Sequence, residues 1–138
     1  MLNIAEQIIT ICKNDPVLSA TNPAGPSITH ADATKTIPWM VIVWLPGTRI
    51  LRSFDGTKIP DYIVSFTIVA PSATQAMTML DRLEVLFDET EFALPNGDYC
   101  LQALLNKPPT IREGQRQSNN QPAYAATAVY KFRVQESA

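Results

Sequence analysis

The chain has 138 residues, of which 46% are hydrophobic and 17% are charged, and its formal net charge at pH 7 is −2. This length and hydrophobic content predict one globular domain with a single core, and they exclude a disordered chain. The charged fraction is below the usual quarter, which indicates that part of the surface is buried in an assembly. A mildly acidic chain has no basic footprint, so nucleic-acid recognition is not expected to be its primary role.

The N-terminal segment predicts a short helix over residues 3–14. Asn3 and Glu6 form a possible capping pair, and apolar residues then recur at helical spacing from Ile4 to Cys12. Asp15-Pro16 ends the helix, because a residue that precedes proline is pushed out of helical geometry. This segment lacks a basic region and carries Glu6, so we do not expect it to be a signal peptide. The loop predicted for residues 19–36 is either functional or a disordered connector.

The next segment, residues 37–70, predicts a pair of strands. The run from Ile37 to Leu45 is β-branched and aromatic, and it is about half the length of a membrane span. We therefore expect a soluble, cytoplasmic protein. A short segment at residues 49–54 lies between two turns. The second strand, Asp61 to Ala70, alternates apolar and polar residues.

A second helix is predicted over residues 72–89. Pro71 stops the strand, and Ser72 with Gln75 forms a capping box. One apolar stripe follows at helical spacing, from Ala76 to Phe87.

The last segment, residues 98–135, predicts another pair of strands. The first runs from about Asp98 to Asn106, where Lys107-Pro108-Pro109 is expected to break it. A polar loop then covers residues 112–121, and the final strand alternates over residues 123–135. The prediction is one α+β domain, residues 1–138, in α-β-β-α-β-β order, with a mixed, mainly antiparallel sheet and both helices on one face.

Sheet geometry predicts a contact surface. Four strands span roughly 20 Å, and two helices of about 10 Å diameter cover only one face. The strand at residues 37–45 is nevertheless apolar on both sides, with Trp39 on one side and Trp44 on the other. One side must meet either a partner molecule or the loop at residues 22–36.

The residues do not predict catalysis, a metal site or a cofactor. His30, near Asp32 in the loop, is the single histidine, and no nucleophile can be paired with it. Cys12 and Cys100 could form a disulfide, but buried free thiols in a reducing cytosol are favoured. Five acidic residues are interpreted as a solvated surface: Asp81, Glu84, Asp88, Glu89 and Glu91.

The sequence from Val64 to Leu83, Val-Ser-Phe-Thr-Ile-Val-Ala-Pro-Ser-Ala-Thr-Gln-Ala-Met-Thr-Met-Leu-Asp-Arg-Leu, resembles phage tail-terminator (tail-completion) proteins. In that family a strand ends in a short turn, an Ala and Leu helix follows directly, and a long alternating strand closes the chain. The resemblance implies a ring, usually a hexamer, that caps the tail tube and joins it to the head connector. DNA passes through such a ring without specific binding, in the host cytoplasm during assembly and in the virion afterwards.

Two alternatives to a tail terminator stay open, namely another phage neck or head-completion adaptor and a small ligand-binding α/β domain. For a ring protein, we expect the long loops and the tryptophans to contact neighbouring subunits, the tube or the connector. The predicted contact residues are Trp39, Trp44, Arg112, Arg116, Gln117, Asn119 and Asn120.

Overall fold

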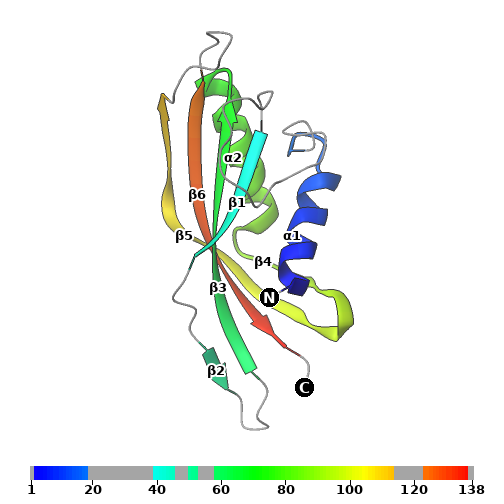
Figure 1. The fold of residues 1–138 in the computed structure, drawn as a ribbon. Helices are drawn as coiled ribbons and strands as arrows, with labels where there is room; N and C mark the ends of the chain where they lie inside the picture. Colours follow the sequence, from blue (N-terminus) through cyan, green and yellow to red (C-terminus); the bar gives the residue numbers. More distant parts are fainter. Residues whose placement is uncertain (1, 19–38, 46–49, 53–57, 114–122, 137–138) are drawn as a thin grey trace.

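The computed structural model describes residues 2–18, 39–45, 50–52, 58–113 and 123–136. These residues form a single α+β domain with two helices and an antiparallel sheet in the strand order β1-β3-β6-β5-β4, with β2 paired to β3 (Figure 1). The element bounds are α1 Leu2–Asn14, β1 Trp39–Leu45, β2 Ile50–Arg52, β3 Lys58–Ala70, α2 Ala73–Phe87, β4 Thr90–Ala93, η2 Pro95–Gly97, β5 Tyr99–Glu113 and β6 Tyr124–Gln135. The predicted fold class is therefore confirmed, and each of the described ladders is antiparallel.

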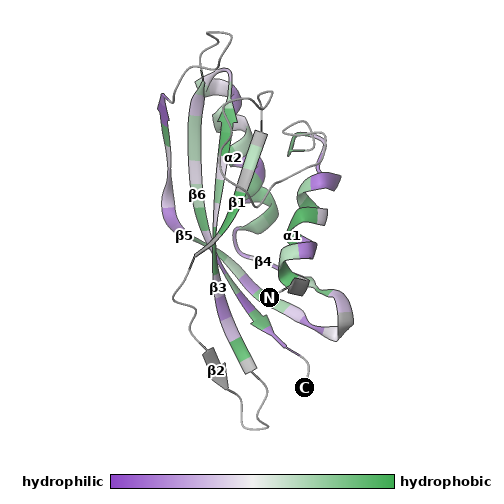
Figure 2. Ribbon diagram, viewed as in Figure 1, coloured by the Kyte–Doolittle hydropathy of each residue, from purple (hydrophilic) through white to green (hydrophobic). Residues whose placement is uncertain are grey.

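Both helices cover the same face of the sheet, as predicted (Figure 1). One core cluster contains Ile4 and Ile8 of α1, Met79 and Leu83 of α2, and the buried positions of the strands. In Figure 2, the strands β3 and β6 that contribute to this core carry many hydrophobic residues, whereas hydrophilic residues gather in the last part of β5. The alternation in the last strand is what places apolar residues on the core side.

Helix α2 begins as the capping pattern predicts. Ser72 is extended, with φ −143° and ψ 154°, and its hydroxyl oxygen accepts a hydrogen bond from the Gln75 amide at 3.1 Å. We expect Ser72→Ala to lower the free energy of unfolding by about 1 kcal/mol, because one amide of the first turn loses its acceptor. Urea denaturation measures this change, and Ser72→Asp is the control because it keeps an acceptor. An equal loss in both variants would contradict a capping role.

The structure corrects two predictions near the end of the chain. Lys107-Pro108-Pro109 does not break the strand, since β5 continues to Glu113, with register shifts between Leu105 and Lys107 and between Lys107 and Thr110. Proline has no backbone N–H to donate, which costs little at the edge of a sheet. This stretch of β5 lies at such an edge, because β4 pairs only with the first part of β5. The predicted helix 72–89 ends at Phe87, and the next residues enter a strand, β4, that was not predicted.

Candidate contact surfaces

The face of the sheet opposite the helices, called here the open face, carries the alternate residues of β1, β3, β5 and β6. On β6 the even-numbered residues from Ala126 to Val134 are buried, whereas the odd-numbered ones from Ala125 to Arg133 are half-buried. Val69 and Ala123 form a small second cluster with Ala125, so one end of this face is covered. The loop expected to cover the face, residues 22–36, lies outside the described residues.

An ion pair crosses the open face between β3 and β6. Asp61 and Arg133 are register partners, and the Arg133 Nε–Asp61 Oδ1 distance is 2.8 Å. A second hydrogen bond, 3.1 Å from Arg133 Nη2 to Asp61 Oδ2, makes the contact bidentate. The bonded carboxylate raises the pKa of Arg133, and Asp61 is only 4% exposed. Asp61 is the one acidic residue of β3, and this ion pair neutralises its charge.

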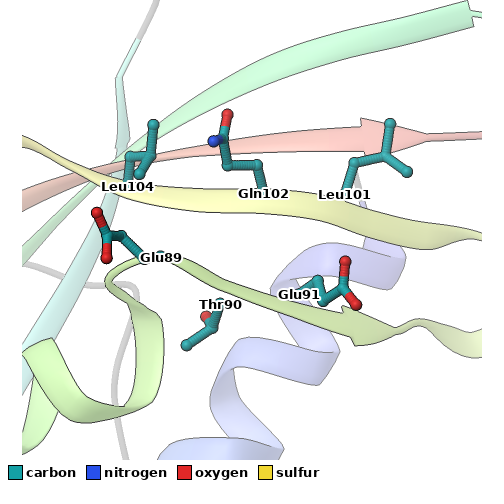
Figure 3. A pocket seen from close by; sticks show the side chains of 6 residues that line it. All are labelled: Glu89, Thr90, Glu91, Leu101, Gln102 and Leu104. Atoms are coloured by element: carbon teal, nitrogen blue, oxygen red, sulfur yellow. The ribbon is translucent and has the colours of Figure 1, made fainter.

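A β-bulge in β5 adds side chains to the open face. Thr90 pairs with Ala103 and Phe92 pairs with Cys100, so Glu91 alone faces two residues of β5. Leu101 and Gln102 consequently point to the same side as Leu104 (Figure 3). Together with the residues from Glu89 to Glu91 they line a hollow beside β4.

Glu89 occupies a strained backbone conformation at the rim of this hollow. Its φ is 58°, and its amide donates a 2.7 Å hydrogen bond to the Ala103 carbonyl. A residue with a Cβ pays about 1–2 kcal/mol for left-handed geometry, and glycine does not. We expect Glu89→Gly to raise the free energy of unfolding by about 1 kcal/mol in urea denaturation. Glu91→Gly, an exposed position in β4, should lower it instead by about 0.5–1 kcal/mol; a loss in both variants would contradict the strain.

The outward side of α2, called here the helix face, combines acidic and apolar residues. Asp81 and Glu84 are exposed, and Val85 and Met77 are 64% and 55% exposed. Asp88 lies at the end of this side, where its Oδ1 accepts a 3.0 Å hydrogen bond from the Leu105 amide. Asp81, Glu84, Val85 and Asp88 line an open hollow. The predicted solvated acidic surface is confirmed for Asp81 and Glu84.

The two helices are joined by an ion pair between Asp15 and Arg82. Burial alone would raise the pKa of Asp15, but hydrogen bonds from Arg82 and from the Leu18 and Val17 amides outweigh it, so the pKa lies below its usual value. The hydrogen bond to Asp15 also raises the pKa of Arg82. Arg82 is the one basic residue of α2, and this ion pair neutralises its charge.

The remaining groups with a shifted pKa are buried, except for Tyr62, which is half-buried. Cys12 and Cys100 are free and 0% exposed, as predicted, and burial raises the pKa of each thiol to about 12. Both thiols therefore stay protonated and unreactive near neutral pH. Burial also raises the pKa of Tyr130 and of Tyr62, and the hydroxyl of Tyr62 donates a 2.6 Å hydrogen bond to Glu136.

The structure describes only part of the predicted contact set. Trp39 and Trp44 lie in β1, opposite Val69 and Val64 of β3, but their side chains are outside the description. Arg112 is exposed near the end of β5, opposite Ala125. The other predicted contact residues lie outside the described residues: Arg116, Gln117, Asn119 and Asn120. His30 and Asp32, for which the sequence predicts no catalytic role, lie outside them as well.

Two absences apply to the part of the chain that the structure describes. Within it, no group of three or more His, Cys, Asp or Glu side chains could hold a metal ion. No helix of that part is both long enough and apolar enough to cross a membrane.

The fold resembles that of a chain in a solved virion. The particle is the virion of a native gene transfer agent; the TM-score is 0.57, the sequence identity is 12%, and the match covers 92% of this chain and 90% of that chain. No protein-family model and no curated protein matches this chain. At 12% identity, the likeness is one of fold across nearly the whole length of both chains.

Proposed function

We propose that this chain is a structural protein of a tailed-phage particle, and within that class a tail terminator. The observation that carries the proposal is the fold likeness to a chain of a gene transfer agent virion, which spans nearly all of both chains. The resemblance of the segment Val64–Leu83 to tail terminators supports the finer assignment. In this role, copies of the chain form a ring, most simply a hexamer, that caps the tail tube and joins it to the head connector.

The surfaces of the chain support an assembly role. Both described helices lie on one side of the sheet, and aliphatic side chains on the other side are half-buried. Helix α2 in addition exposes Met77 and Val85. The net charge of −2 suits a ring through which DNA passes, because a strongly basic opening would retain the DNA. The proposed partners are the chain itself, the tube protein and the connector.

We propose no catalytic role for the chain. Its two thiols have raised pKa values, so they are poor nucleophiles. The exposed carboxylates Asp81 and Glu84 line an open hollow on the outward surface of α2, where they are accessible to water. These features support a role in contacts.

The test is the growth of tail tubes in the presence of the purified protein. The tail-tube protein of the same phage is polymerised with and without the purified chain, and the products are imaged by negative-stain electron microscopy. We expect rings at one end of each tube and an arrest of elongation. Tubes that grow to the same lengths with bare ends would overturn the terminator role. Binding to head connectors but not to tubes would instead identify a neck adaptor.

A further inference from the structure

The open face places lysines on an aliphatic background. Two adjacent cross-strand rows follow from the strand register. Their members are Val43, Ser65, Val129 and Lys107 in the first row, and Ile63, Lys131 and Leu104 in the second. Val43 is 41% exposed and Lys107 is exposed, so the rows are accessible. They lie away from the covered end of the face at Val69 and Ala123.

The helix face has the opposite charge on a similar apolar background. Met77, Asp81, Glu84 and Val85 follow the i, i+4, i+7, i+8 spacing that puts residues on one side of a helix. Two of the five large hydrophobic residues that the described structure exposes are Met77 and Val85. Exposed apolar groups ringed by charges are typical of a contact surface.

Internal ion pairs sharpen this difference in charge. Asp61 on the open face is paired with Arg133, and Arg82 on α2 is paired with Asp15. Among the described ion pairs, none includes Lys107, Lys131, Asp81 or Glu84. Along the two rows, the charges outside these ion pairs are therefore positive, and on the helix face they are negative. The acidic side chains of Glu89 and Glu91 lie beside the rows, in the hollow at the β4 edge of the open face.

The two surfaces lie on opposite sides of the molecule, because α2 packs on the other face of the sheet (Figure 1). A single copy cannot bring them together, whereas two copies can. A contact between unlike surfaces leaves one surface of each kind unused on the pair, so further copies can add in the same way. Such a contact closes into a ring when its rotation permits.

The geometry points to a head-to-tail contact in which the helix face of one copy docks on the open face of a second copy. Met77 and Val85 pack on the aliphatic rows, and Asp81 and Glu84 lie beside the lysines Lys107 and Lys131. This inference rests on the proposed assembly into a ring and adds which surfaces meet. Complementary charges fix the pairing, and burial of the apolar residues supplies the attraction.

The test reverses the charges on each surface separately and then together. One variant carries Asp81→Lys and Glu84→Lys, a second carries Lys107→Glu and Lys131→Glu, and a third carries all four changes. Sedimentation velocity measures self-association of the protein alone and on tail tubes. We expect each two-residue variant to need at least about tenfold more protein for half-assembly, because like charges then meet. The third variant should regain most of the wild-type association, because its surfaces are complementary again.

Two controls separate folding from association. Thermal unfolding checks that each variant is folded, and Lys107→Glu alone, at an exposed position, replaces the second variant if the half-buried Lys131 proves necessary for folding. Glu6→Lys, a reversal at an exposed position of α1, should leave association unchanged.

The outcomes distinguish this inference from the proposed function. Wild-type caps on tubes that persist in every charge variant would overturn the head-to-tail contact and leave the terminator role intact. Loss and rescue of self-association without any capping of tubes would support the contact and overturn the terminator role. A wild-type chain that stays monomeric with and without tubes would overturn the contact.

Discussion

Phe87→Ala is expected to lower the free energy of unfolding by about 3–5 kcal/mol, a large part of the roughly 5–15 kcal/mol that stabilises a domain. Phe87 is 0% exposed at the end of α2 and contacts rings from three strands. Its ring centroid lies 5.5 Å from those of Phe66 and Phe132, 6.2 Å from that of Tyr130 and 6.4 Å from that of Phe92. Alanine would leave a cavity that β3, β4 and β6 cannot all move to fill.

Urea denaturation followed by circular dichroism measures the effect of Phe87→Ala. Phe87→Leu keeps most of the volume but loses the ring contacts, so we expect a smaller loss, of about 1–2 kcal/mol. Val85→Ala is the matched control on the same helix, because Val85 is 64% exposed and its loss should stay within about 0.5 kcal/mol. A loss for Phe87→Ala no larger than that of the control would contradict the packing described for this aromatic cluster.

The periodic elements could be predicted from the sequence because their patterns arise from burial on one side. The stripe of α2 and the alternation of β6 each match the core, with Leu83 and Tyr130 among the buried residues. The cap at Ser72 is a local interaction, so it was predictable as well. These signals need only the residues of one element.

The errors occur where neighbouring strands decide the structure. Strand β4 has four residues, of which Glu91 is charged and exposed, and it is a strand because β5 pairs with it. Pro108-Pro109 lies within β5 because that part of the strand is at an edge, where a missing amide costs little. The sequence alone does not show which part of β5 lies at the edge of the sheet.

The contact surfaces were predictable only in part. The alternation of the last strand already placed Lys131 opposite the aromatic residues, and this was the available signal for the open face. Lys107 was missed because it was assigned to the strand break. The partners of Asp15 and Asp61 were also missed, because each ion pair joins residues far apart in the chain: Asp15 with Arg82, and Asp61 with Arg133.

Asp15→Ala is expected to lower the free energy of unfolding by about 2–3 kcal/mol at neutral pH, the second largest effect. The Asp15 side chain is 2% exposed, and its Oδ2 accepts hydrogen bonds from the amides of Val17 at 3.1 Å and Leu18 at 3.0 Å. Its Oδ1 accepts from Nε of Arg82 at 3.0 Å. Alanine removes these acceptors at the point where the chain leaves α1, and the buried amide of Leu18 loses its bond to this carboxylate.

Asp15→Asn distinguishes the contribution of the ion pair with Arg82 from that of the hydrogen bonds to the Val17 and Leu18 amides. Asparagine keeps an acceptor for the amides but cannot form an ion pair with Arg82, so we expect a loss smaller than that of Asp15→Ala. Asp81→Ala is the control, because Asp81 is exposed on α2 and should change the free energy of unfolding by less than about 0.5 kcal/mol. Equal losses for Asp15→Asn and Asp15→Ala would mean that the charge, and not the turn, carries the effect.

The contribution of Asp15 should depend on pH with a defined sign. Its pKa is lower in the folded protein than the usual value of about 3.9, so the folded state holds the ionised form more tightly than the unfolded state does. The resulting stability is fully present above about pH 5 and is lost as the pH falls below about 4 towards the folded pKa. We therefore expect the difference between wild type and Asp15→Asn in urea denaturation to be constant from pH 7 to 5 and to shrink at pH 3. A difference that grows on acidification would contradict the lowered pKa, because only a raised folded pKa makes the protonated carboxyl stabilising.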